Sequence, residues 1–284
     1  MRHFLTLYIY LLLFLAVLGL GGRVFCENSP AIPNYKVAVG SSSIYSAVKE
    51  FVDAKHITDI IIPPDLCPGH FDLKPGDVEK FLESDLIILH NWQKDLPAIK
   101  SLLRVANPNS EKLAWVPIQG SWMLPQNYVK GLEAISKLLM EKKIISKETG
   151  EEILERRKRE ILRFSEDIKN KISALKPENI YVISSSFQSE FLRWLGFNVV
   201  GEYSRAEEIT LKTWGDLLKT GKEKDVKLIV ENLQSGELQT VKALANDLNA
   251  KSVVLSNFPM AETEDKSWED SVLRNVNIII NALR

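Results

Sequence analysis

Short, wholly apolar segments alternate with amphipathic ones in the first part of this 284-residue chain. Strands that are apolar throughout and separated by helices are typical of a parallel sheet covered on both faces. Such strands are predicted at 35–40, 57–63, 86–90 and 112–117. Helices are predicted between them at 44–55, 74–84 and 96–105. The pattern predicts an N-terminal α/β lobe over residues 35–140.

The middle of the chain contains no strand candidate between Asn127 and about Leu175. Residues 151–175 repeat their apolar positions at a spacing of three to four, which predicts a helix of about 37 Å at 1.5 Å per residue. A solvated coiled-coil arm and a rigid strut between two lobes both fit this pattern. The strut is favoured because strands and helices alternate again after Pro177. We therefore predict a bridging helix over 147–176.

The renewed alternation predicts a C-terminal α/β lobe over residues 178–284. Its strands are predicted at 179–184, 198–201, 226–231 and 251–255, and its helices at 187–195, 210–219, 238–248 and 268–283. The predicted fold class is α/β, with two lobes of parallel-type sheets flanked by helices and joined by one long bridging helix. Open α/β sheets bind ligands at the carboxyl ends of their strands, so functional residues are expected there.

The first residues have the composition of an export signal. Phe4–Leu20 contain no charge and follow Arg2 and His3, which predicts a signal peptide or an N-terminal anchor over residues 1–26. Cleavage, lipid attachment at Cys26 and retention of the segment are all compatible with this pattern. The expected location is the periplasm or the outer face of the cell membrane, with membrane association through the N-terminal segment.

The charge balance argues against nucleic-acid binding, and no catalytic motif supports an enzyme. Lys and Arg total 36 against 37 Asp and Glu, so the chain lacks the basic surplus by which proteins bind nucleic acid. It contains no Gly-rich phosphate loop, no Gly-x-Ser-x-Gly and no His-Glu-x-x-His. The serines of 184–186 have no obvious histidine base, because all four histidines lie in the first third of the chain. We therefore expect that this chain is not an enzyme.

The most unusual loop covers residues 63–77 and follows the second predicted strand. It holds His70 between a Pro-Gly turn and Phe71, which favours an imidazole presented on a rigid support. A metal site requires such a presented imidazole. On composition alone, a lone loop histidine is more often solvated than a ligand, so the metal interpretation depends on further residues.

Several segments resemble the periplasmic solute-binding proteins of zinc- and manganese-type ABC importers. The segment PGHFDLKPGDVEKFLESDLIILHN is similar to that family's His-containing loop, helix and strand. WMLPQN, FLRWLGFNVV, VKLIVENLQSG, LANDLNAKSVVLSN and LRNVNIIINAL resemble further units of the family. The resemblance covers nearly all of residues 35–284. It implies two lobes bridged by one helix, a divalent metal as transported ligand (Zn²⁺ first, Mn²⁺ second), and an ABC permease and its ATPase as partners.

The sequence departs from the family at most of the usual ligand positions. Matched by motif, Gly120 stands where a second histidine would be, and serine or asparagine occupies the later positions (Ser184 or Ser185, and Ser256 or Asn257). The departures indicate either a lost metal or a different ligand set. For the second case we predict a site of His70, His90 and Glu231, because the latter two end predicted strands of the two lobes. Metal affinity through histidine is expected to decrease as pH falls through about 6.5, because a protonated imidazole does not bind a metal.

Other interpretations stay open for these residues. His90 fits a buried strand-end histidine bonded to backbone, Glu231 fits a brace between the lobes, and Cys67 fits an inert thiol or a disulfide with Cys26. Trp92 and Trp122 are expected near the cleft mouth, where they would pack the lobes, shield a metal or stack on a metal chelate. The alternative functions are therefore the same scaffold with a non-metal or chelated ligand, or a membrane-anchored recognition protein without a transport role.

Overall fold

The computed structural model describes residues 35–235, 239–262 and 264–284. The predicted signal or anchor over residues 1–26, including Cys26, lies outside the described residues. Within the described part of the chain, no helix is long and apolar enough to cross a membrane.

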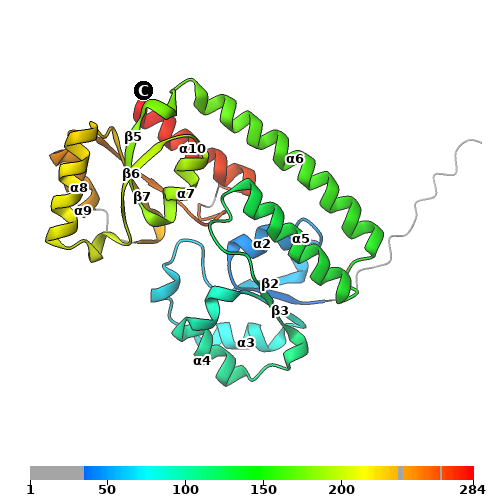
Figure 1. Cartoon of the computed structure of the whole chain (residues 1–284). Helices are drawn as coiled ribbons and strands as arrows, with labels where there is room; N and C mark the ends of the chain where they lie inside the picture. Colours follow the sequence, from blue (N-terminus) through cyan, green and yellow to red (C-terminus); the bar gives the residue numbers. More distant parts are fainter. Residues whose placement is uncertain (1–34, 236–238, 263) are drawn as a thin grey trace, which may run out of the picture. The chain divides into compact units, whose positions relative to one another are not determined.

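The first lobe is a four-stranded parallel sheet in the order β2-β1-β3-β4 (Figure 1). Its strands are β1 (Val37–Val39), β2 (Ile57–Ile60), β3 (Leu86–His90) and β4 (Leu113–Val116). Its helices are α2 (Ser42–Val48), α3 (Pro75–Glu83), α4 (Pro97–Ala106) and α5 (Pro125–Glu141). Every residue of β3 is buried. One core cluster joins Ala38, Ile87 and Leu89 of the sheet to Phe81 of α3 and Leu102 of α4.

The second lobe repeats this arrangement, with the strand order β6-β5-β7-β8, again all parallel. Its strands are β5 (Tyr181–Ser185), β6 (Asn198–Tyr203), β7 (Leu228–Asn232) and β8 (Lys251–Leu255). Its helices are α7 (Ser186–Trp194), α8 (Leu211–Lys224), α9 (Gln239–Asp247) and α10 (Trp268–Leu283). In each lobe the strand order reverses beside the first strand, and the crevice at such a point is where open α/β sheets bind ligands.

The bridging helix is α6 (Lys147–Ser173), whose 27 residues span about 40 Å. It begins at Ser146, whose hydroxyl accepts a hydrogen bond from the Thr149 backbone N–H at 3.1 Å. It ends before Lys176, which has a left-handed conformation, and Pro177. The helix packs against α5 and α10 and runs along both lobes (Figure 1). These elements confirm the predicted fold class.

Two predicted helix ends were wrong. The helix predicted over 44–55 ends at Val48, and the Asp53 side chain starts a separate 3-10 turn by accepting a bond from the Lys55 N–H. The helix predicted over 210–219 continues to Lys224, because Gly221 does not break it. A Cβ at Gly221 would lie 2.5 Å from Leu248 Cδ1, so this glycine allows close packing against the residue that follows α9.

Candidate functional site

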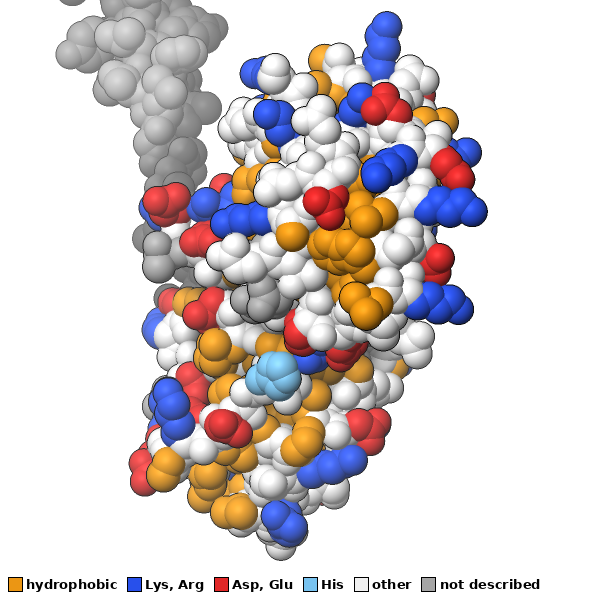
Figure 2. Space-filling view, turned by 90° about the vertical axis from the view of Figure 1, so that its left-hand side faces the viewer, with side chains coloured by type: hydrophobic (Ala, Val, Ile, Leu, Met, Phe, Trp, Pro, Cys, Tyr) orange, Lys and Arg blue, Asp and Glu red, His pale blue; other side chains and the backbone are white. Residues whose placement is uncertain are grey.

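A cavity of about 730 Å³ lies between the two lobes, at the carboxyl ends of β3 and β7. Its first-lobe wall includes His90, Trp92 and Trp122, and its second-lobe wall includes Phe187, Arg205 and Asn232. Figure 2 shows a histidine and several charged side chains between two groups of hydrophobic side chains on one face of the molecule. The carboxyl ends of both sheets therefore contribute to one site, as the strand order predicts.

His90 is the final residue of β3 and is only 1% exposed. Its backbone N–H donates to Gln93 Oε1 at 2.8 Å, and Gln93 Nε2 donates to the Gly40 carbonyl at 2.8 Å. Its Nε2 lies 2.7 Å from Ser41 Oγ, whereas its Nδ1 has no hydrogen-bond partner among the described residues. The hydrogen bond at Nε2 fixes the orientation of the ring, and Nδ1 remains available to a ligand.

Two tryptophans enclose the His90 ring. Trp92 stacks on it at 5.4 Å between centroids, and Trp122 meets it edge-on at 5.0 Å. Burial among these groups lowers the pKa of His90 to about 3. The imidazole is therefore neutral at physiological pH, which is the form that binds a metal.

His70 is exposed and sits in a 3-10 turn over Pro68–His70 after β2. Arg205 from the second lobe approaches it, with Nη1 3.5 Å from His70 Nε2. The guanidinium crosses the loop at Gly69, where a Cβ would come within 3.0 Å of Arg205 Nη2. The Nε2 atom of His70 thus faces a positive charge.

Glu231 lies within β7 and is fully buried. Its Oε2 accepts from the Tyr203 hydroxyl at 3.2 Å and its Oε1 accepts from the Asn232 backbone N–H at 2.6 Å. Burial raises the pKa of this carboxyl above its ordinary value. Successive strand residues face opposite sides of a sheet, so Asn232, one residue further, lines the cavity instead.

Residues 37–282 match a family model described as "Zinc-uptake complex component A periplasmic". The chain belongs to this family. Members are periplasmic solute-binding proteins of metal ABC importers and are not enzymes. Among curated proteins, none matches the chain.

Solved structures share the two-lobed fold of this zinc-uptake family member. A ZnuA crystal structure has 15% sequence identity and a TM-score of 0.71, with 88% of this chain and 99% of that chain covered. The laminin-binding protein Lmb of Streptococcus agalactiae, described as an adhesin with metal-transporting activity, has 18% identity and a TM-score of 0.70, with 88% and 100% covered. A manganese-bound periplasmic metal-binding protein of Candidatus Liberibacter asiaticus has 14% identity and a TM-score of 0.72, with the same coverage. At these identities the likeness establishes the fold alone.

The three ligands predicted for this family member do not converge in the structure. His90 lines the cavity, His70 lies in an exposed turn beside Arg205, and Glu231 is bonded to Tyr203. Across residues 35–235, 239–262 and 264–284, no group of three or more His, Cys, Asp or Glu residues is placed to hold a metal ion. The predicted three-ligand site stays a prediction. Gly120, matched by motif to a histidine ligand position, and Asn257, one of two residues matched to a late carboxylate position, line the cavity.

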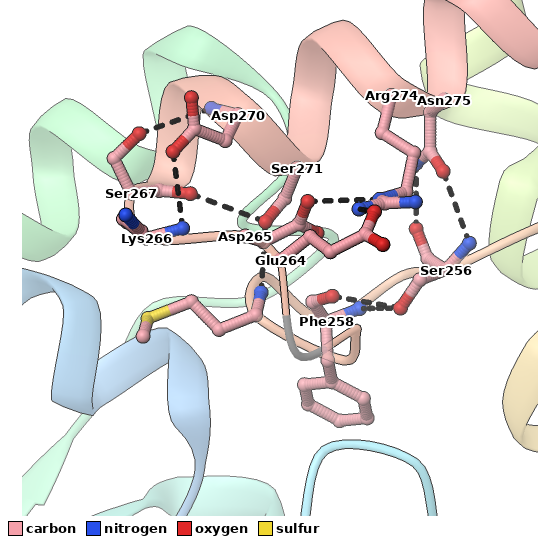
Figure 3. A network of polar contacts seen from close by, with 11 residues as sticks. Ser256, Phe258, Glu264, Asp265, Lys266, Ser267, Asp270, Ser271, Arg274 and Asn275 are labelled. Atoms are coloured by element: carbon pink, nitrogen blue, oxygen red, sulfur yellow. Dashed lines mark hydrogen bonds and ion pairs between the residues drawn. The ribbon is translucent and has the colours of Figure 1, made fainter.

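A polar network fixes the second-lobe rim of the cavity (Figure 3). After β8, Ser256 donates its N–H to Asn275 Oδ1 at 3.2 Å and accepts from Asn275 Nδ2 at its carbonyl at 2.8 Å. The Ser256 hydroxyl donates to the Phe258 carbonyl at 2.7 Å, and the Phe258 ring, which lines the cavity, points away from the network. Gln234 Nε2 donates to Ser256 Oγ at 2.9 Å and to the Pro64 carbonyl of the first lobe at 2.7 Å.

One wall of the cavity was missed by the sequence analysis. Phe187, Glu190 and Arg193 follow one another at a spacing of three on α7, and all three line the cavity. Arg193 pairs with Glu202 of β6, which also lines it. The spacing places these side chains on one helix face, and that helix starts directly at the carboxyl end of β5. The start of this helix directly after β5 was the sequence signal that could have identified these three residues as part of the site.

Proposed function

We propose that this chain captures a divalent transition metal in the inter-lobe cavity and delivers it to the permease and ATPase of an ABC importer. The family supplies the transport role, and relatives of the same fold were solved with manganese, cadmium, nickel or zinc. The observation that carries the proposal is the buried Nδ1 atom of the cavity-lining residue His90, which has no hydrogen-bond partner in the part of the chain that the structure describes.

His90 has the arrangement of a metal-ligating histidine. Such histidines donate one ring N–H to a second group, which fixes the ring and leaves the other nitrogen for the metal. With its proton on Nε2, His90 donates to Ser41 Oγ, 2.7 Å away, and Nδ1 has a lone pair available. An imidazole nitrogen suits zinc better than manganese, so zinc is the first candidate and manganese the second.

His70 and Glu231 stay in the proposal as further ligands. His70 would have to exchange its contact with Arg205 for the metal. Glu231 would have to leave Tyr203 and turn toward the cavity. Both steps cost existing contacts, so His90 ranks first, His70 second and Glu231 third.

A titration of the chelator-stripped full chain with zinc and with manganese tests the proposal. Replacing His90 by Gln is expected to weaken zinc binding at least tenfold, because the only cavity imidazole among the described residues is lost. Ser41→Ala is expected to weaken zinc binding about 10-fold to 100-fold, because the hydroxyl that holds the His90 ring through Nε2 is lost. His56→Gln is the matched control, since His56 is also buried but does not line the cavity. A parent that binds neither metal would overturn the proposal.

We further propose that residues 1–26 direct export or anchor the chain outside the cell membrane. The uncharged run Phe4–Leu20 supports this part. Without residues 1–26, 34 basic and 37 acidic side chains remain, a net charge of −3, which adds no attraction to anionic lipid. A chain that begins at Glu27 should therefore remain in the supernatant of a membrane sedimentation, and pelleting with permease-free vesicles would contradict this.

A further inference from the structure

The inter-lobe cavity is much larger than a bare metal ion requires. Its volume of about 730 Å³ falls within the range of about 300–1,000 Å³ that is usual for small-molecule sites. Four ligand atoms, each taken as large as a water molecule of about 30 Å³, would fill only roughly a sixth of this space. The size of the cavity therefore fits a small organic molecule better than an ion alone.

Partly exposed aromatic side chains line both walls of the cavity. Trp92 from the first lobe is 41% exposed and Phe187 from the second lobe is 40% exposed, and both line the cavity. Uncovered aromatic faces on a cavity wall favour an apolar or planar ligand body, which removes them from water. A hydrated metal ion has no apolar surface to bury against these side chains.

Three cavity-lining residues have a buried polar atom without a partner among the described residues. These atoms are His90 Nδ1, Trp122 Nε1 and Asn257 Oδ1. Buried polar groups are as a rule hydrogen-bonded, so each of these atoms has unused bonding capacity that a bound molecule can fill. The indole N–H requires an acceptor and the amide oxygen requires a donor or a cation. A cargo that offers acceptors together with a metal meets this set of requirements.

The charges of the cavity favour an anionic group beside the metal. Arg193 is already paired with Glu202, whereas Arg205 reaches its carboxylate neighbour Glu207 only at 3.9 Å. Arg205 belongs to the second lobe and contacts the loop of the first lobe, with its Nη1 3.5 Å from His70 Nε2. A bare cation bound at that nitrogen would be repelled by the guanidinium, but a carboxylate would form a charge-assisted hydrogen bond with it.

From these four observations we propose that the cargo enters as a divalent transition metal already held by a small organic chelator that bears carboxylates. The metal meets His90 Nδ1, a chelator carboxylate pairs with Arg205, and the organic body lies between Trp92 and Phe187. The inference rests on the proposed function for its metal and adds the chemical class in which that metal arrives.

The test compares three probes on the chelator-stripped full chain: zinc alone, and 1:1 complexes of zinc with citrate and with the planar aromatic chelator pyridine-2,6-dicarboxylate. Calorimetry measures affinity, and native mass spectrometry counts what is bound. We expect at least one zinc complex to bind tenfold or more tighter than zinc alone, in a species that contains one zinc and one chelator. Zinc alone binding as tightly as both complexes, or a bound species without chelator, would overturn the inference.

Arg205→Gln separates the two forms of cargo. It should weaken binding of the zinc complex at least tenfold and should strengthen binding of bare zinc, because a repelling charge is removed. Arg193→Gln is the matched control and should have a smaller effect on the complex, since its guanidinium is held by Glu202. Unchanged circular dichroism melting of each variant shows that it folds. Equal weakening of both cargo forms by Arg205→Gln would contradict the chelate, and failure of every zinc-containing probe to bind would contradict the metal function as well.

Discussion

Arg157 Nη2, on the bridging helix α6, lies 2.5 Å from Glu269 Oε1 in the first turn of α10. The Nε atom of the same guanidinium lies 3.0 Å from Glu50 Oε2, just after α2 of the first lobe. One largely buried cation therefore pairs with a carboxylate from each lobe. Burial raises the pKa of Glu50, and the neighbouring Arg157 charge opposes that rise. The two lobes are joined electrostatically at the strut as well as by its covalent chain.

Arg157→Met is expected to lower the free energy of unfolding by about 1.5–3 kcal/mol, because two partly buried carboxylates lose their charged partner. Denaturant unfolding measures the loss. Lys158→Met, one residue further, is the control: its ion pairs with Glu133 and Glu155 lie near the surface, and such pairs contribute about 1 kcal/mol or less. Equal losses in the two variants would contradict the role of Arg157.

The pH dependence of stability should report on His90. Its pKa is about 3 in the folded chain, below the ordinary value of 6.5, so the unfolded chain binds a proton there that the folded chain does not. Stability from this group is full above pH 6.5 and is lost as pH falls toward 3, by about 1.4 kcal/mol per pH unit. His90→Gln should flatten the pH profile of unfolding over this range. An unchanged slope in the variant would show that His90 titrates normally.

Zinc affinity should change little between pH 8 and pH 5. Metal binding through an ordinary exposed imidazole would weaken near pH ~6.5, as the sequence alone suggested. Burial keeps His90 neutral across this range, so proton competition at its Nδ1 is absent. Calorimetric titrations at several pH values measure this. A tenfold loss centred near pH 6.5 would identify an exposed histidine as the main ligand.

Gly40→Ala should disturb both the fold and the site. A Cβ at Gly40 would lie 2.1 Å from Gln93 Oε1, the atom that holds the His90 backbone N–H. We expect a loss of about 1–3 kcal/mol in unfolding free energy from overpacking and weaker zinc binding. The control is Gly76→Ala, where a Cβ would meet no atom within 4 Å. If the Gly40→Ala variant unfolds and binds zinc as the Gly76→Ala control does, the close approach of Gly40 to Gln93 does not constrain the fold or the site.

The sequence predicted the elements well where apolar runs are sharply bounded. The strands at 86–90 and 251–255 and the helix at 268–283 have the predicted limits. The predicted end of α8 was wrong, because the sequence alone does not distinguish a glycine that permits close packing from a glycine that ends a helix. Only the neighbouring Leu248 distinguishes them.

The sequence placed the candidate site at the correct edges of the two sheets. It did not show which of the candidate side chains face the cavity. His90, Trp92 and Trp122 line the cavity, as strand-end position and family resemblance indicated. Glu231 occupies the expected strand, yet its side chain faces Tyr203, since the side of the sheet depends on the exact register. The approach of Arg205 to His70 joins residues 135 positions apart and left no local pattern to find.

The most direct test of the proposed metal site is a crystal structure of the zinc-loaded chain with anomalous scattering measured at the zinc edge. We predict one strong peak inside the inter-lobe cavity, about 2.0–2.1 Å from His90 Nδ1, the usual zinc–imidazole distance. A peak that lies only on the outer surface, or a loaded cavity in which His90 Nδ1 contacts no metal, would contradict it.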